Sequence, residues 1–226
     1  AAAFTENEVA WKRYITDSLI ETVLARDVLQ MSKIAKPVLL RHLFALAATL
    51  PAQCVSYTKM LGQLQDAGNT TTLAHYLKLL ESAFLASGLE LFSRNKQRKR
   101  GSSPKLVLWN NALINALSTR TFDASIADSA WWGRLVENAV GACLCNSLNS
   151  IEYTITYWRK GNYEVDYIVA RGPDIHAIEV KSGIGKNLSG LASFQSQYPE
   201  TKSLIIGGPG VPLEEFFSKD TAQWLI

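Results

Sequence analysis

The sequence has few cysteines and no long hydrophobic run, and each absence argues against a class of protein. Among its 226 residues, Cys54, Cys143 and Cys145 form an odd set without the paired Cys and His spacing of zinc sites. This pattern disfavours a disulfide scaffold and a structural zinc finger, and predicts reduced thiols. Apolar stretches such as 43–50 are far shorter than the roughly 20 residues of a membrane helix. The N-terminus also lacks the basic and apolar regions of a signal peptide, so we expect a cytoplasmic protein without membrane contact.

Positive charge is concentrated in the first part of the chain. Residues 1–130 carry 15 basic and 10 acidic side chains, whereas residues 131–226 carry 8 and 10. One short stretch without any acid holds six of the basic residues: Arg94, Lys96, Arg98, Lys99, Arg100 and Lys105. Because such a block attracts phosphate backbones, it predicts a nucleic-acid-binding surface and DNA as a partner. A solvated hairpin tip is the alternative interpretation.

Helical periodicity dominates residues 4–118, which we expect to form one module. The pattern predicts helices over 6–29, from Pro37 to just before Pro51, over 56–66 and over 71–85, then short strands at 89–92 and 105–109. The predicted inner stripes of the first and last helices are Trp11, Ile15, Leu19, Val23 and Leu24, and Leu73, Tyr76, Leu77, Leu80 and Phe84. Helices followed by a hairpin with a charged tip are the plan of a winged helix. Some winged helices bind DNA, and others connect proteins.

Residues 130–226 have the pattern of a separate α/β domain. Helical spacing at 131–148 is followed by strand-like runs at 152–158, 163–169 and 175–181, a helix at 188–197 and a short strand at 203–206. Between the modules, periodicity lapses into small polar residues at 119–129. The sequence therefore predicts an α+β protein in which a helical module precedes a small sheet domain.

Charged residues lie inside the core-like strands of this second module. Side chains alternate along a strand, so Glu164 and Asp166 share one face, as do Glu179 and Lys181. Carboxylates that converge from neighbouring strands repel each other, and Mg²⁺ or Mn²⁺ relieves that repulsion. Lys181 could then orient water or stabilise a phosphate, and Glu137 could add a carboxylate from the preceding helix. The alternative interpretation is that Glu179 and Lys181 form an ordinary ion pair on one face.

Three motifs resemble a known family. The segments GRLVENAVGACL, YWRKGNYEVDYIV and AIEVKSG resemble the C-terminal part of bacterial and archaeal AAA+ ATPases of the domain-of-unknown-function 4143 group. The earlier segments RDVL, TTTLAHYLKLLESAFL and SPKLVLWNNAL resemble the region between the ATPase domain and the end of those proteins. One departure is Asn110-Asn111, where the family commonly has an aspartate.

This resemblance implies a PD-(D/E)xK nuclease-like domain, similar to restriction endonucleases, after a winged-helix-like module. The catalytic residues that it implies are Asp166, Glu179, Lys181 and Glu137, with Asp166, Glu179 and Glu137 as ligands of Mg²⁺ or Mn²⁺.

The sequence contains no phosphate-binding loop. Around Gly185-Lys186, the nearest match to G-x-x-x-x-G-K-[ST], Val180 replaces the first glycine and Asn187 replaces the Ser or Thr. We therefore expect no ATP site here, and the resemblance implies a missing N-terminal ATPase domain as partner. The predicted function is that of a nucleic-acid-interacting C-terminal fragment with Mg²⁺-dependent phosphodiester hydrolysis. The alternative is a non-catalytic DNA- or protein-binding module that regulates the ATPase.

Overall fold

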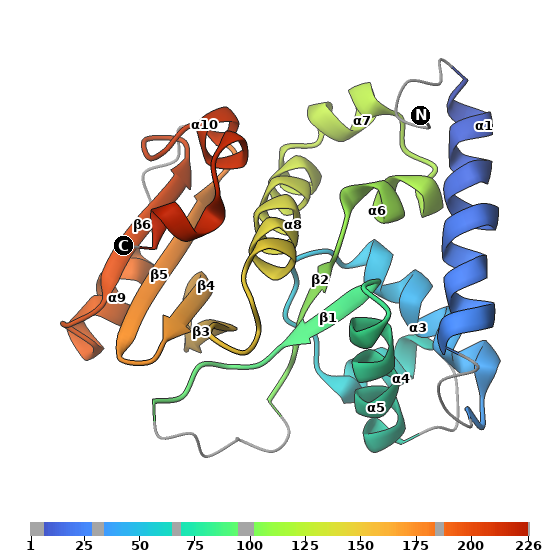
Figure 1. Ribbon diagram of the computed structural model, residues 1–226, viewed down its shortest axis with the longest axis horizontal. Helices are drawn as coiled ribbons and strands as arrows, with labels where there is room; N and C mark the ends of the chain where they lie inside the picture. Colours follow the sequence, from blue (N-terminus) through green and yellow to red (C-terminus); the bar gives the residue numbers. More distant parts are fainter. Residues whose placement is uncertain (1–6, 29–33, 65–68, 95–101, 184–187, 226) are drawn as a thin grey trace.

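The computed structural model describes residues 7–28, 34–64, 69–94, 102–183 and 188–225. It confirms the α+β class: a helical first half is followed by a four-stranded sheet with its own helices. Figure 1 shows the long helix α8 between the helical half and the sheet. Among the described residues, no helix has the length and the apolar character needed to cross a membrane.

The first helix is wound differently from the prediction. It begins with α1 (Glu8–Arg13) and continues as the π-helical segments η2 (Tyr14–Ile20) and η3 (Val23–Val28). A π-helix has more residues per turn than an α-helix, which moves the buried stripe. Ile15, Ile20 and Leu24 are buried, whereas the predicted stripe residue Leu19 is 41% exposed. The prediction of Leu19 as a core residue is therefore wrong.

Three helices follow close to their predicted positions. They are α3 (Pro37–Thr49), α4 (Tyr57–Leu64) and α5 (Thr70–Ser82). The Asn69 side chain caps α5 by accepting a hydrogen bond from the Thr72 amide at 2.7 Å. The prediction of Phe84 as an inner residue of this helix is also wrong. Helix α5 ends before Phe84, whose φ is +56°. Its side chain is 66% exposed and makes a T-shaped contact with the Trp109 ring.

A hairpin connects the helical half to the sheet. Strand β1 (Ala86–Leu89) pairs antiparallel with β2 (Lys105–Leu108). Beyond β1, the Phe92 amide donates to the Tyr157 carbonyl and the Tyr157 amide donates to the Glu90 carbonyl. The short helices α6 (Asn111–Leu117) and α7 (Phe122–Ala127) then lead to α8 (Ser129–Ser147), which Asp128 caps. Residues 90–92, which follow β1 in the chain, therefore lie against Tyr157 of the sheet half.

The sheet has the order β3-β4-β5-β6. Strands β3 (Thr154–Lys160), β4 (Tyr163–Arg171) and β5 (Asp174–Lys181) form an antiparallel meander, and β6 (Lys202–Gly207) lies parallel to β5 after α9 (Ser189–Gln197). The chain ends with α10 (Leu213–Ser218) and the 3-10 turn η4 (Thr221–Trp224). All four strands match the predicted ones to within two residues, because glycine and asparagine turns delimit them.

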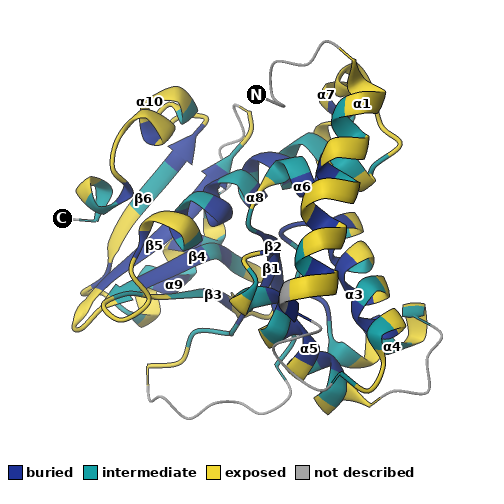
Figure 2. Cartoon of the chain, turned by 45° about the vertical axis from the view of Figure 1, so that its right-hand side comes forward, coloured by how far each residue is buried: buried dark blue, intermediate teal, exposed yellow. Residues whose placement is uncertain are grey.

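The hydrophobic core continues across the predicted boundary between the modules. Leu135 of α8 packs in the core of the helical half, while Val136 and Val140 pack in the core beneath the sheet. Leu89 and Val107 of the hairpin also belong to the sheet core. In Figure 2 the strands β4 and β5 are largely buried, whereas α1 presents an exposed outer face. Helix α8 is thus shared by both halves.

Candidate acidic site around Lys105

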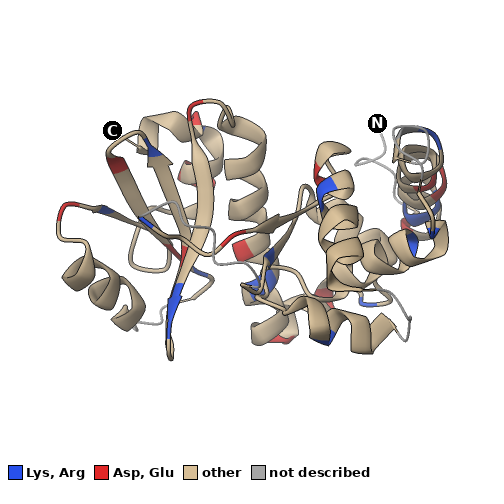
Figure 3. Cartoon of the chain, turned by 90° about the horizontal axis from the view of Figure 1, so that it is seen from below, with Lys and Arg blue, Asp and Glu red and all other residues tan. Residues whose placement is uncertain are grey.

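A buried lysine from the hairpin lies among carboxylates of the sheet half. The side chain of Lys105 is fully buried and forms an ion pair with Glu137 of α8. Its Nζ atom also lies 3.5 Å from Glu164 Oε1 and 3.5 Å from Asp166 Oδ1, and donates to the Asp166 carbonyl at 3.1 Å. Figure 3 shows acidic and basic segments next to one another at the junction of the two halves. We call Lys105, Glu137, Glu164 and Asp166 the Lys105 cluster.

A bulge in β4 helps to build this cluster. Thr156 pairs with Ile168 and Trp158 pairs with Val165, so Asp166 and Tyr167 together oppose a single residue of β3. A bulge of this kind can turn two consecutive side chains toward the same side of a sheet. Asp166 accordingly contacts Lys105 with its carboxylate, while the Lys105 ammonium lies 4.9 Å from the centre of the Tyr167 ring. The Tyr167 hydroxyl donates to the Glu137 carbonyl at 2.8 Å, which fixes α8 above the bulge.

Glu179 and Lys181 lie beside this cluster on β5. Asp166 Oδ2 accepts a hydrogen bond from the Val180 amide at 2.8 Å, so the Asp166 side chain reaches β5 between them. Lys181 Nζ donates to Glu179 Oε1 at 2.6 Å. The other oxygen, Glu179 Oε2, is buried without a hydrogen-bond partner, and the Glu179 side chain is only 10% exposed. A buried carboxylate oxygen without a partner is costly, and this one is the clearest unsatisfied acceptor of the site.

The electrostatics of the site reflect an excess of carboxylates. Burial and then the charge of Asp166 raise the pKa of Glu179 to about 7. Burial and Asp166 likewise raise the pKa of Glu137 to about 8, although Lys105 opposes the shift. Burial alone would lower the pKa of Lys105, but Glu137 and Asp166 raise it well above its usual value. Lys105 therefore stays charged, and one lysine does not fully compensate the surrounding acids.

A pocket of about 430 Å³ opens next to the site. Glu137 and Lys181 form part of its wall, and the half-buried residue Arg134 of α8 lines it as well. No ion pair or hydrogen bond joins the Arg134 side chain to another described residue. The pocket thus offers two cationic groups and connects the buried acids to solvent.

The structure brings together some of the predicted site residues and separates others. Glu137 and Asp166 meet on Lys105, and Glu179 and Lys181 adjoin them. Glu164 and Arg134 were not predicted as site residues, although strand alternation had already placed Glu164 on the same face as Asp166. The burial of Lys105 had no signal in the sequence.

The basic stretch is only partly described. Lys96, Arg98, Lys99 and Arg100 lie outside the described residues, and Arg94 is exposed and pairs with Glu200. The assignment of Lys105 to a nucleic-acid-binding surface is wrong, because its side chain has no solvent exposure and is held by carboxylates.

The three cysteines are free thiols, and Cys54 Sγ donates to Glu164 Oε1 at 3.6 Å.

We distinguish an inner position beside Lys105 from an outer position beside Glu179, because a divalent cation would meet different groups at each. Within the described ranges, no group of three or more His, Cys, Asp or Glu side chains is arranged to hold a metal ion. On the inner side, the Lys105 ammonium already occupies the space between Glu137, Glu164 and Asp166. On the outer side, the unpartnered Glu179 Oε2 and the neighbouring Asp166 are hard oxygen donors that suit Mg²⁺ or Mn²⁺. Asp166 and Glu179 are therefore the carboxylates that could hold a cation, while Glu137 is engaged by Lys105.

Comparisons with known proteins divide the chain at about the same place as its motifs do. The family model described as "Domain of unknown function (DUF8612)" matches residues 2–124, more than half of the chain. The model described as "Domain of unknown function (DUF4143)" matches residues 132–211, in agreement with the resemblance of the C-terminal motifs. No curated protein matches the sequence.

One solved structure, that of protein VC1899 from Vibrio cholerae, aligns with 95% of this chain at 14% identity and a TM-score of 0.24. The chain spans about half of that protein, as the alignment covers 51% of it. A likeness at this level carries no information about function.

Proposed function

We propose that this chain, which belongs to the DUF8612 family and whose C-terminal part matches the DUF4143 model, binds nucleic acid and hydrolyses phosphodiester bonds. The observation that carries the proposal is the buried, unpartnered Glu179 Oε2 beside Asp166, with Lys181 on the same strand. A Mg²⁺ or Mn²⁺ ion held by Asp166 and Glu179 would activate water and polarise the phosphate. We further propose that this half is a PD-(D/E)xK nuclease-like domain.

Arg134, Lys181 and the Val180 amide each have a role in this proposal. The pocket beside Glu137 is where a phosphate would lie, since Arg134 and Lys181 supply positive charge at its wall. Lys181 would stabilise the charge that develops on the phosphate, and its hydrogen bond to Glu179 holds its amine near the acids. The Val180 amide fixes Asp166 in place. The helical half would contribute a winged-helix-like module and its basic stretch to nucleic-acid binding, and an ATPase domain of a longer protein would be the partner.

A second function is supported by the Lys105 cluster itself. Three carboxylates that share a buried lysine are already neutralised in part without any metal ion. This supports a non-catalytic DNA- or protein-binding module that regulates an ATPase, in which the acidic residues serve only the fold.

Metal-binding calorimetry with Mn²⁺ separates the two functions. We expect the wild-type chain to release heat on Mn²⁺ binding and Asp166→Asn to lose it, while the exposed Asp174→Asn on β5 serves as the matched control. With labelled DNA and Mn²⁺, Asp166→Asn and Lys181→Ala should each lower the cleavage rate by about 100-fold or more. A wild-type chain that neither binds Mn²⁺ nor cleaves DNA would favour the non-catalytic module.

A further inference from the structure

Lys105 has unusual surroundings for a lysine. A lysine is almost never fully buried unless it is paired. The side chain of Lys105 has no exposed surface, and carboxylates surround its ammonium group. It is the first residue of β2, and it enters the sheet half from a hairpin of the helical half. Its backbone pairs with Leu89, and its side chain extends away from that hairpin into the acids of α8 and β4.

Four oxygen atoms surround the Lys105 ammonium, one of them Asp166 Oδ1 at 3.5 Å. The other three are Glu137 Oε1, the Asp166 carbonyl at 3.1 Å and Glu164 Oε1 at 3.5 Å. The Tyr167 ring lies over a further side of the charge. The ammonium is therefore enclosed by oxygen and aromatic groups as a bound cation would be, and it is attached to the chain by a covalent bond.

We propose that Lys105 is a built-in cation that fills the inner half of the acidic site, so that the site accepts one divalent ion instead of two. The inner position is bounded by Glu137, Glu164 and Asp166, and the ammonium closes it. The outer position at Asp166 and Glu179 stays available next to the pocket, and this part rests on the proposed function. Lys105 is thus a positioning residue that sets how many metal ions the site holds.

Charge and size explain why the ammonium excludes a second ion. A divalent ion at the inner position would need the same carboxylate oxygens and would lie within a few ångströms of the ammonium, where like charges repel strongly at low dielectric. Removal of the amine would leave three carboxylates facing the position that Nζ occupies. Such a set of hard oxygens suits Mn²⁺.

The test counts Mn²⁺ ions by calorimetry and by electron paramagnetic resonance of free Mn²⁺. We expect one ion per wild-type chain and two per Lys105→Met chain, with the new site at least about tenfold tighter than any weak second site in the wild type. Thermal unfolding gives an independent readout, because Mn²⁺ should raise the Tm of Lys105→Met more than that of the wild type. Lys105→Arg keeps the charge and should still bind one ion.

The possible results distinguish this inference from the proposed function. No ion in the wild type and one in Lys105→Met would refute the outer site but support the built-in cation. Two ions in the wild type, or equal stoichiometry and equal Mn²⁺-induced Tm shifts in both proteins, would overturn the inference. If Lys105→Met does not fold without metal, Lys105→Met with Glu137→Gln restores part of the charge balance. This double variant should again bind one more ion than Glu137→Gln alone, and an equal number would overturn the inference.

Discussion

Asn138 joins the two halves of the molecule, and its replacement should destabilise both. This fully buried residue of α8 accepts from the Leu108 amide at 2.9 Å and donates to the Leu108 carbonyl at 3.0 Å. It also donates to Asn111 Oδ1 at 2.8 Å. The side-chain amide of Asn138 thereby forms the pair of hydrogen bonds that a neighbouring strand would form with Leu108 of β2. In Asn138→Ala, the buried amide and carbonyl of Leu108 lose their partner.

The magnitude follows from the two orphaned backbone groups. Each buried group left without a partner lowers the free energy of unfolding by about 1–3 kcal/mol. The better helix propensity of alanine offsets about 0.5 kcal/mol of this loss. We therefore expect Asn138→Ala to lower the free energy of unfolding by about 3 kcal/mol. For a chain of this length, that loss corresponds to a decrease in Tm of about 6–12 °C.

Urea denaturation followed by circular dichroism measures this change. The control is Asn115→Ala in α6, because that side chain is exposed and forms no hydrogen bond with any described residue. It should change the free energy of unfolding by less than about 0.5 kcal/mol. A loss below about 1 kcal/mol in Asn138→Ala would refute the reasoning, since it would mean that the Leu108 groups find other partners.

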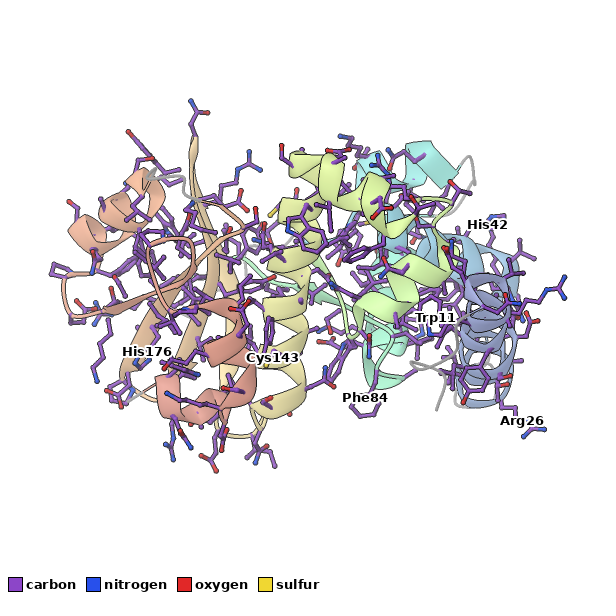
Figure 4. All side chains as sticks on the ribbon, turned by 90° about the horizontal axis from the view of Figure 1, so that it is seen from above. Trp11, Arg26, His42, Phe84, Cys143 and His176 are labelled. Carbon is purple, nitrogen blue, oxygen red and sulfur yellow. The ribbon has the colours of Figure 1, made fainter. Side chains whose placement is uncertain are left out.

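Two further predictions concern close packing and pH. A Cβ atom at Gly141 would lie 2.3 Å from the buried Tyr167 hydroxyl, so Gly141→Ala should lose about 1–3 kcal/mol of stability in urea. At Gly62 the same change meets no atom within 4 Å, so Gly62→Ala should gain up to about 1 kcal/mol, and equal effects would contradict the steric argument. Burial, followed by the charge of Lys202, lowers the pKa of His176. The Nε2 atom of this histidine is buried without a hydrogen-bond partner. Figure 4 shows His176 in the sheet half, far from Trp11 in the helical half. Because the unfolded chain binds the His176 proton more tightly, the contribution of His176 to stability should be complete above a pH of about 6.5 and should be lost below it. His176→Gln should weaken this dependence of the urea midpoint on pH, and an unchanged profile would assign it to other groups.

Much of the fold follows directly from local patterns in the sequence. Glycine turns at 160–162 and 171–174 and alternating β-branched residues define the meander, and strand alternation correctly places Glu179 with Lys181. The burial of Asp166 and Glu179 among apolar neighbours also points to the site. These features depend on residues close together in the chain, which is why the pattern reveals them.

The errors arise where distant parts of the chain determine the outcome. Lys105 belongs to a basic stretch by sequence, but the acids that bury it are at least 32 positions away. The exposure of Leu19 follows from π-helical winding, which α-helical periodicity does not anticipate. The bulge at Asp166 and Tyr167 appears only in the pairing of β4 with β3. Tertiary contacts decide each of these features, and a single sequence carries no local sign of them.

The segment that passes beside β3 also protects an edge of the sheet. Strand β3 is one of the two edge strands of the sheet, and an edge strand offers free amides and carbonyls to other molecules. Here the backbone groups of Tyr157 are taken by Glu90 and Phe92. A shortened chain that began after the hairpin would present the middle of β3 to its neighbours, and aggregation through that edge is the outcome to expect.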